Sequence, residues 1–328
     1  AARTAWAIEH IDGTTAVSSE NKNSYKARHK KSVSIREQRC YNTYLQSAIR
    51  REPTTINTHS DGFNGATGHG GGYRLVYYKT ATMLWNLQYV LGDSLFQAAM
   101  KNYFNTYCIA HPYVEDFRNS IIRFTHCDLN WFFDQWIETY KTIDYSVSRP
   151  RLLQKNDSGF VYDISFRRNG EMQMPVDFSC ETRSGKKFGY HVPNDWFVKK
   201  TSSRILPRWI GWDKLQTEYH ARVILPEKIR KVSIDTSARL ADSYRINNAW
   251  PRNIVTEKDY LVLQPVSFMQ YSILHRPDVF FNRTDGIKAG WHAEGSYAGL
   301  LHRFSFSVWA NTRFLSNGKF GSAAEWVS

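Results

Sequence analysis

Hydrophobic residues in the first part of the chain recur at helical spacing. Between residues 73 and 91, apolar side chains return every three or four positions, as they do along one face of an α-helix. The pattern stops at Gly92, a residue typical of helix C-termini, and Asp93 can cap a following helix. Further helices are predicted over residues 114–124 and after Asp128. This part of the chain is therefore expected to be a helical bundle.

From about residue 146 the pattern changes to the two-residue alternation of β-strands. Residues 159–166 form one predicted strand, and Asn169-Gly170 is a strong signal for a tight hairpin turn. A second turn is predicted at Ser184-Gly185. Further strands are predicted over residues 175–180, 219–225 and 231–234. Short strands at this spacing indicate a β-sandwich.

The last stretch contains longer alternating segments, over residues 286–297 and 302–314. In the second of them one face of the predicted strand is apolar and the other is largely polar. The apolar face carries Phe304, Phe306, Val308 and Ala310, opposite Ser305, Ser307 and Trp309. The fold class is therefore predicted as α+β multidomain, with helical residues 1–145, a β-sandwich over 146–255 and an incomplete β-rich domain over 256–328.

Composition narrows the class of protein. Hydrophobic residues make up 42%, aromatic residues 15% and charged residues 22%, which is typical of a globular chain. The net charge of +13 is concentrated between residues 22 and 51. We interpret this segment as a solvated helix face, because no zinc-finger, RNA-recognition or basic-zipper pattern accompanies it. Nucleic acid is therefore not an expected partner.

Cysteine usage and hydropathy exclude two further classes of protein. The 4 Cys are widely spaced without a C-x-x-C, so they predict neither a zinc ribbon nor a dense disulfide framework. No stretch approaches the length of a transmembrane helix. The sequence begins at Ala1 without a signal peptide or an initiating Met, and we expect it to be a fragment of a longer protein.

An ordered series of motifs carries the functional information. Tyr77-Tyr78-Lys79-Thr80-Ala81 opens a predicted helix, Leu91-Gly92 ends it, and Asp116-Phe117 and Leu129 to Trp136 follow. This series resembles the aminopeptidase N-type zinc metallopeptidases, the gluzincins, and in particular the large bacterial envelope-type members. The resemblance covers roughly residues 6 to 140. It implies the helical C-terminal lobe of a thermolysin-like catalytic domain, followed by a β-sandwich.

Tyr77 is the catalytic residue that the resemblance implies. In this family the first Tyr of the Tyr-x-Lys motif hydrogen-bonds the oxyanion formed when zinc-bound water attacks the peptide carbonyl. A phenol suits this role because it is a neutral donor at neutral pH. The alternative is that Tyr77 only packs beside Tyr73 and Tyr78.

Glu9 is the metal ligand that the resemblance implies. Trp6-Ala-Ile-Glu9 fits the Trp-x-x-Glu context of the family's third zinc ligand, although His10 stands where the family has Gly. A carboxylate beside two imidazoles suits Zn²⁺ and leaves one coordination position for water. Asp12, followed by Gly13, is a rival placement. A Glu9 without any metal role is the third possibility.

The histidine pair and the general base of the family are missing from the sequence. None of the 11 His belongs to an H-E-x-x-H motif. By the family's spacing this motif would lie upstream of Ala1, so we expect the fragment alone to be inactive. The intact protein is expected to bind Zn²⁺ and hydrolyse peptides, and a bacterial envelope-type member suggests a periplasmic or cell-surface location.

Two alternatives remain open. The chain could be a non-catalytic envelope binding protein that uses its aromatic β region to hold a polymer or a membrane surface. The basic segment over residues 22–51 could instead bind nucleic acid. The glycine-rich run at residues 65–72 is interpreted as a loop beside the cleft, with Asp61 and His69 as unassigned polar candidates, because it lacks the Lys-Ser/Thr of a phosphate-binding loop.

Overall fold

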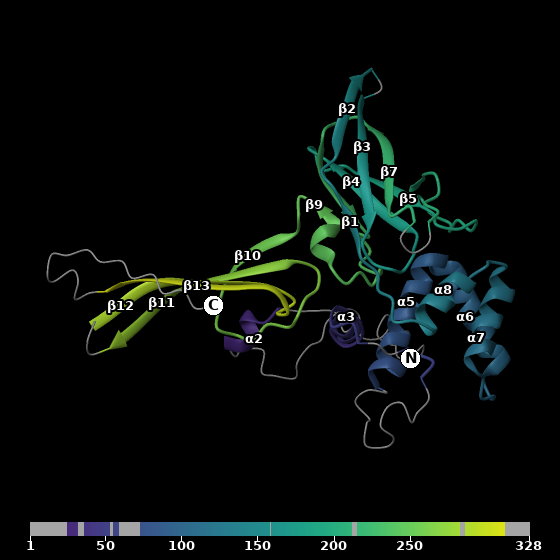
Figure 1. The fold of residues 1–328 in the computed structure, drawn as a ribbon, viewed down its shortest axis with the longest axis horizontal. Coiled ribbons are helices and arrows are strands. Elements are labelled where there is room, and N and C mark those ends of the chain that lie inside the picture. Colours follow the sequence, from purple (N-terminus) through teal and green to yellow (C-terminus); the bar gives the residue numbers. More distant parts are fainter. Residues whose placement is uncertain are drawn as a thin grey trace. The chain divides into compact units, whose positions relative to one another are not determined.

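The computed structural model describes residues 25–31, 36–52, 55–58, 73–157, 159–211, 215–282 and 286–311 (Figure 1). These residues divide into two compact units, which we describe separately. One unit lies within residues 35–252, and the other combines residues within 15–34 with residues within 253–328. The α+β class is confirmed, whereas the predicted boundaries at residues 145 and 255 stay a prediction.

The first unit begins with helices. In chain order they are η1 (Arg36–Tyr41), α3 (Asn42–Ile49), η4 (Tyr73–Lys79), α5 (Thr80–Leu91), α6 (Asp93–Tyr107), α7 (Val114–Thr125) and α8 (Asn130–Ile137), where η1 and η4 are wider π-helical turns. The predicted helix over residues 73–91 is confirmed as η4 and α5 together. Gly92 lies between α5 and α6 at φ +81°, a conformation that favours glycine.

Two details of the helices differ from the predictions. Asp93 does not cap α6 but is its first residue, and its Oδ1 accepts hydrogen bonds from Gln88 and Arg239. The helix α5 is not amphipathic in the structure, because Ala81 through Leu91 are all buried. Its polar residues Thr82 and Asn86 are buried with the rest and are satisfied by hydrogen bonds inside the protein.

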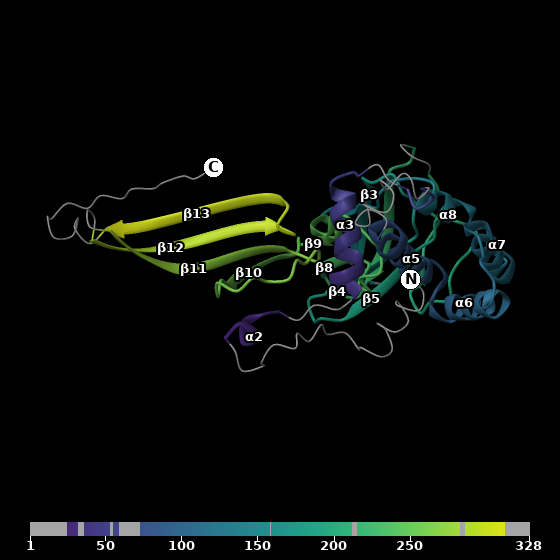
Figure 2. The ribbon, with the colours of Figure 1, turned by 90° about the horizontal axis from the view of Figure 1, so that it is seen from below.

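A β-sandwich follows the helices in the same unit (Figure 2). Its strands are β1 (Tyr145–Val147), β2 (Arg151–Asn156), β3 (Gly159–Arg168), β4 (Val176–Thr182), β5 (Lys187–Val192), β6 (Arg204–Ile205), β7 (Glu218–Leu225), β8 (Ile229–Ile234) and β9 (Ala249–Trp250), with the 3-10 turn η5 (Arg245–Asn248) between the last two. One sheet has β3 between β7 on one side and β1 and β2 on the other, and the second sheet has the order β6-β5-β4-β8-β9.

The sandwich core forms where the buried faces of the two sheets meet. Burial alternates along β4 and along the second half of β7, as the sequence pattern predicts for strands with one covered face. Phe166 of β3 packs against Phe178 of β4 with ring centroids 4.6 Å apart, and Phe178 stacks on Tyr190 of β5. The predicted strands over residues 175–180, 219–225 and 231–234 are confirmed, and so is the turn at Ser184-Gly185.

The predicted hairpin at Asn169-Gly170 is wrong. The strand β3 ends at Arg168, and the chain then crosses to β4 in the other sheet. The backbone N–H groups of Asn169 and Gly170 both donate to the carbonyl of Asp144, at 2.8 and 3.0 Å. A side chain at Gly170 would meet the Thr142 carbonyl at 2.4 Å, so the glycine here permits a close approach rather than a hairpin turn.

The second unit consists of an open sheet and a short helix. Its elements are α2 (Tyr25–His29), β10 (Ile254–Lys258), β11 (Tyr271–Asn282), β12 (Gly286–Tyr297) and β13 (Leu301–Asn311). The strands lie in the order β10-β11-β12-β13, with β10 parallel to β11 and the others antiparallel. The two predicted long strands are confirmed as β12 and β13.

The basic segment at residues 22–51 does not form one continuous helix face. Its described residues belong to different units, since α2 packs with the last sheet whereas α3 packs with the other helices. Arg36 lies over the rings of Tyr41 and Trp85 at 5.8 and 5.9 Å, and Lys31 forms an ion pair with Glu257. The prediction that these basic residues share one solvated helix face is therefore wrong.

Candidate functional site

Tyr77 lies on η4, immediately before the buried helix α5. Its side chain is 46% exposed, so the phenol can reach a ligand in solvent, whereas Tyr78 is half-buried. The π-helical turn η4 packs against α3 and η1. The sequence therefore places the predicted catalytic tyrosine at the exposed end of a helix whose remainder is fixed in the core.

The helix behind Tyr77 is held by hydrogen bonds along its length. The hydroxyl of Thr82 donates to the Tyr78 carbonyl at 2.8 Å, and the amide of Asn86 donates to the Thr82 carbonyl at 2.8 Å. The Asn86 side chain also accepts a 3.1 Å hydrogen bond from the backbone N–H of Ala241, in the β-sandwich part of the chain. These contacts fix the position from which the phenol projects.

Lys79 of the Tyr-x-Lys motif has a structural role. Its side chain is buried, and Nζ donates a 2.9 Å hydrogen bond to the carbonyl of Thr139, just after α8. Burial lowers the pKa of Lys79 to about 8. The lysine thus ties the start of α5 to the segment directly after α8.

A polar cluster joins α5 to the β-sandwich at the other end of the helix. Lys199 Nζ donates to Asp177 Oδ2 at 2.5 Å and to the carbonyl of Tyr89 at 2.8 Å, and His191 Nδ1 lies 2.6 Å from Asp177 Oδ1. Burial acts to raise the pKa of Asp177, but the His191 hydrogen bond and the Lys199 charge outweigh it and leave that pKa below its usual value. We interpret this cluster as an anchor.

Two further carboxylates lie close together at the junction of helices and sandwich. Asp242 is fully buried and accepts hydrogen bonds from the backbone N–H groups of Tyr145 and Tyr244, at 2.8 and 2.9 Å. Burial, together with the charge of Asp144, raises the pKa of Asp242 to about 7. Because its oxygens accept hydrogen bonds from backbone N–H groups, we interpret Asp242 as a residue that fixes the local backbone rather than one that binds a ligand.

The predicted metal ligands cannot be placed. Glu9 and its rival Asp12 lie outside the described residues, as do Asp61, His69 and the glycine-rich run at 65–72. Within the ranges that the structure describes, no group of three or more His, Cys, Asp or Glu side chains is arranged to hold a metal ion. The described residues therefore do not supply a zinc site, and the roles of Tyr77 and Glu9 stay predictions.

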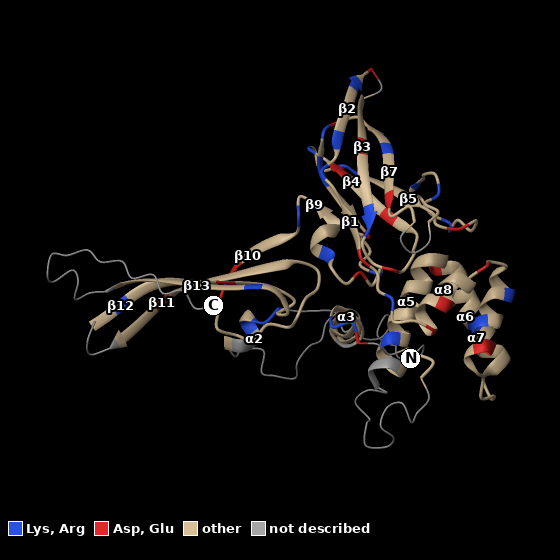
Figure 3. Cartoon of the chain, viewed as in Figure 1, with Lys and Arg blue, Asp and Glu red and all other residues tan. Residues whose placement is uncertain are grey.

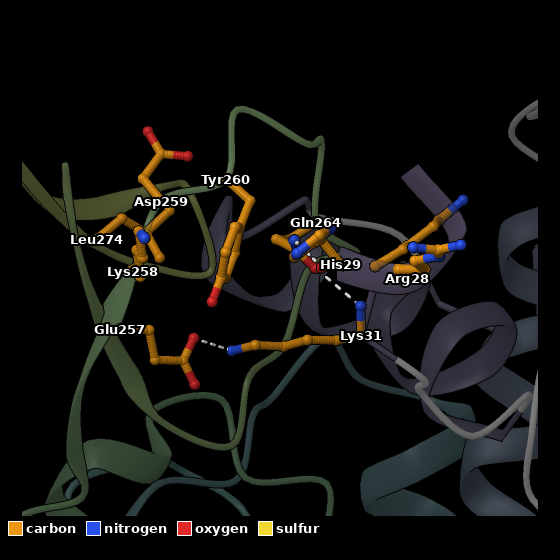
Figure 4. Close-up of a pocket in the computed structure, with 10 residues that line it drawn as sticks. Arg28, His29, Lys31, Glu257, Lys258, Asp259, Tyr260, Gln264 and Leu274 are labelled. Carbon is orange, nitrogen blue, oxygen red and sulfur yellow. Dashed lines mark hydrogen bonds and ion pairs between the residues drawn. The ribbon is translucent and has the colours of Figure 1, made fainter. Parts of the chain in front are cut away.

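A cavity of about 450 Å³ in the second unit was not predicted from the sequence (Figure 4). It lies between α2 and the strands β10 and β11. The backbone N–H of Lys31 donates to Gln264 at 2.9 Å, and Gln264 donates to the carbonyl of His29 at 2.8 Å. Lys31 and Glu257 form an ion pair across the cavity. These contacts fasten α2 to the sheet, and no local pattern could reveal them because the partners are more than 200 positions apart.

Comparisons with known proteins bear on the helical part of the first unit. Residues 72–136 match the family described as the Peptidase family M1 domain. This segment runs from η4 through α8 and contains Tyr77 and Lys79. No curated protein matches the chain. The described residues also contain no helix long and apolar enough to cross a membrane.

One solved structure similar to the chain is the crystal structure of Legionella pneumophila aminopeptidase A in complex with aspartic acid. The two share 16% sequence identity and superpose with a TM-score of 0.37, over 62% of this chain and 24% of that chain. The chain thus spans about a quarter of that protein's length. The family match supports the resemblance for the helical segment: residues 72–136 are similar to the Peptidase family M1 domain.

Proposed function

We propose that this chain is part of a zinc-dependent metallopeptidase of the aminopeptidase N type, which hydrolyses peptide bonds in peptide substrates. The observation that carries the proposal is the family match over residues 72–136, which includes Tyr77. The position of Tyr77 supports it, because the residue is 46% exposed on η4, directly before the buried helix α5. A catalytic donor needs such a fixed base and an open approach for substrate.

In this proposal Tyr77 stabilises the negative charge that develops on the carbonyl oxygen of the scissile bond. A phenol donates a hydrogen bond without bringing a charge of its own, so it stabilises the transition state more than the neutral substrate. Removal of one such donor typically lowers kcat by about 100- to 1,000-fold. The helix behind the tyrosine limits its movement and so keeps the donor in place.

Zinc is part of the proposal because the family that the sequence resembles consists of zinc metallopeptidases. Glu9 would be one ligand, and the histidine pair and general base would come from other parts of the full protein, since these 328 residues contain no H-E-x-x-H. When bound, zinc supplies the Lewis acid that activates the attacking water. The 328 residues by themselves are accordingly proposed to be inactive, with or without added Zn²⁺.

The test uses the full-length gene product and a fluorogenic peptide substrate. Wild-type protein should hydrolyse the peptide, and a zinc chelator should abolish the activity. The Tyr77→Phe variant should lose about 100-fold or more in kcat with little change in KM. The control is Tyr78→Phe, the neighbouring half-buried tyrosine, which should keep wild-type turnover. Full turnover in the Tyr77→Phe variant would remove Tyr77 from the mechanism.

We further propose a periplasmic or cell-surface location, in keeping with the envelope-type members that the sequence resembles. Fractionation of cells that express the full-length protein tests this, since the protein should accompany the envelope rather than the cytosol. The second candidate function is a non-catalytic envelope binding protein. It is favoured by the exposed aromatic residues of β11 to β13, and a full-length protein without any peptidase activity would support it.

A further inference from the structure

The sheet formed by β11, β12 and β13 has one apolar face that continues across all three strands. The register places Val279 of β11 beside Ala289 of β12, and Trp291 of β12 beside Val308 of β13. Because side chains alternate between faces, the same face carries Ile273, His275, Pro277, Val279, Phe281, Ile287, Ala289, Trp291, Ala293, Gly295, Phe304, Phe306, Val308 and Ala310. His275 is the only polar side chain among these residues, and the hydroxyl of Tyr271, at the start of β11 on the same face, donates to the His302 carbonyl.

The opposite face of the same strands is mostly polar and is the less exposed of the two. On β12 the apolar-face positions Ile287, Ala289 and Trp291 are exposed, whereas Lys288, Gly290 and His292, which follow each of them on the other face, are only partly exposed. Val279, Phe281 and Trp291 are exposed by 71%, 66% and 48%. In a water-soluble protein the apolar face of such a sheet is covered by the core and the polar face is exposed to solvent. In this sheet the apolar face is the more exposed of the two, and we call this arrangement the inversion.

The inversion is built into a well-formed sheet. Trp291 stacks on His275 with ring centroids 5.0 Å apart, so the one polar side chain of the apolar face is covered by an aromatic ring. At Gly295 the ring of Phe304 and the hydroxyl of Tyr271 approach so closely that a side chain there would clash with both. Aromatic residues packed over a strand glycine stabilise a sheet and complete a smooth apolar surface. The exposed face is therefore not the result of poor strand pairing.

The dimensions of the sheet match a lipid bilayer. The strands β11 and β12 have 12 residues each, so they are about 36 Å long at roughly 3.3 Å per residue. The hydrocarbon core of a bilayer is about 30 Å thick. Strands that alternate apolar and polar residues over this length, with the apolar side outward, are typical of protein that contacts lipid. Figure 3 shows few charged residues along these strands.

Basic residues gather at one end of the sheet. Arg28 and Lys30 of the α2 segment, Lys258 at the end of β10 and Arg303 near the start of β13 are all exposed, and β10 runs beside the first half of β11. This end is thus suited to anionic lipid headgroups, which attract lysine and arginine near a membrane surface. A protein partner or a second copy fits less well, because such interfaces also need hydrogen-bonding groups, and this apolar face offers little beyond His275.

We propose that the apolar face of β11 to β13 contacts the hydrocarbon of a lipid membrane, with the basic end at anionic headgroups. The proposal concerns the second unit alone and does not depend on the peptidase function. It explains why Val279, Phe281 and Trp291 of the apolar face are exposed, whereas Lys288 and His292 of the other face are only partly exposed. It also identifies the membrane lipid as the partner of a region whose aromatic content the peptidase chemistry does not require.

The test compares two labelled cysteine variants of the whole chain. Cys108 is the exposed cysteine among the four, so Cys108→Ser gives a background in which an introduced cysteine is labelled selectively. Val308→Cys places a polarity-sensitive fluorophore on the apolar face, and Ser305→Cys, on the same strand, places it on the polar face. Protein is diluted from urea into vesicles of phosphatidylcholine with a minor share of phosphatidylglycerol.

We expect the label at Val308→Cys to shift to shorter emission wavelengths with vesicles and to be quenched by lipids brominated on their acyl chains. The label at Ser305→Cys should change little. In flotation, Val308→Asp should lower the vesicle-bound fraction at least about tenfold, because a charge on a lipid-facing position opposes insertion. Ser305→Asn, a polar change on the other face, should float like the wild type.

Three results would overturn the proposal. In the first, both labels respond equally to brominated lipid, which means that the two faces are not distinguished by the membrane. In the second, the wild type stays with the aqueous fraction as a dimer that Val308→Asp converts to a monomer, which makes the face a surface for a second copy. In the third, the protein neither floats nor self-associates, and the exposed face has no lipid affinity.

Discussion

The backbone N–H of Asp177 in β4 donates a 2.8 Å hydrogen bond to the hydroxyl of Tyr89 in α5. The Asp177 side chain is also the acceptor for Lys199, whose ammonium group lies 4.1 Å from the centre of the Tyr89 ring. One residue of the sandwich therefore fixes the helix that begins next to Tyr77. The position of the candidate catalytic tyrosine depends on a contact at the opposite end of its helix.

The first prediction concerns this anchor. Lys199→Met leaves the Asp177 carboxylate with His191 but without its ammonium partner, and we expect a loss of about 3 kcal/mol in the free energy of unfolding. This expected loss lies at the lower end of the range for breaking a buried ion pair, because the Asp177 side chain is 28% exposed. Urea denaturation followed by circular dichroism measures it. The control is Lys200→Met, an exposed neighbour, which should change stability by less than about 0.5 kcal/mol.

The double variant Asp177→Asn with Lys199→Met checks the origin of this loss. If the cost arises from an unpaired buried charge, the double variant should be more stable than the sum of the two single changes predicts. Simple additivity would mean that the two side chains act independently and that the anchor is not a pair.

The helices were largely predictable from sequence because their signals are local. The end of α5 at Gly92 follows from one glycine, and the long strands β12 and β13 follow from alternation. The complete burial of α5 was not predictable, because Thr82 and Asn86 look like a solvent-facing stripe until their buried hydrogen-bond partners are known. Long-range partners decide such positions, and a single sequence does not show them.

The two main errors have the same origin. Asn169-Gly170 has the composition of a hairpin turn, yet its N–H groups bond to Asp144, some 25 residues earlier, and the chain changes sheets. The basic segment looked like one helix face, yet α2 within it belongs with the C-terminal sheet. For the candidate site, the sequence placed Tyr77 at the start of a helix, and the anchor at Asp177 was visible only in three dimensions.

The second prediction concerns the pH dependence of stability. The pKa of Asp242 is raised by burial in the folded protein, so the folded state binds a proton more tightly than the unfolded chain. The stability that Asp242 contributes is therefore present at low pH and is lost as pH rises through about 7. Asp242→Asn should weaken one backbone hydrogen bond and so lower the free energy of unfolding by about 1–3 kcal/mol at pH 5. It should also reduce the decline of the free energy of unfolding between pH 5 and 8.

Chemical denaturation across that pH range tests the second prediction. Asp157→Asn serves as the control, because Asp157 is exposed, directly after β2 and away from the buried pair, and its profile should stay parallel to the wild type. A decline that persists unchanged in Asp242→Asn would assign the pH dependence to other groups.

The third prediction uses Lys79. Burial lowers the pKa of Lys79 to about 8, below its value of about 10.4 in an unfolded chain. Above pH 8 the unfolded chain therefore binds more protons, and the folded state gains stability as pH rises toward about 10. Compared with Lys79→Met, the wild type should gain on the order of 2–3 kcal/mol over this window. Lys101→Met, at an exposed position of α6, should show no such difference from the wild type.

The fourth prediction concerns the pairing of β12 with β13. A side chain at Gly290 would lie 2.1 Å from the backbone carbonyl oxygen of Val308 and 2.4 Å from the Trp309 ring. Gly290→Ala should therefore force the strands apart and destabilise the second unit by about 1–3 kcal/mol. Hydrogen exchange of the β12 and β13 amides should be faster in this variant. Ser305→Ala, on the paired strand, should leave the exchange rates unchanged.

The hydrogen bond from the Tyr25 hydroxyl to the Tyr260 carbonyl joins residues that are 235 positions apart. Ribosomes add about 5–20 residues per second, so α2 is synthesised roughly 10 to 50 seconds before the sheet it packs against exists. The helix α5 and its partner Asp177 are only 88 positions apart and can associate much earlier. Among the elements that the structure describes, α2 therefore waits longest for its partner during translation, and nascent-chain chaperones and proteases have that interval in which to bind it.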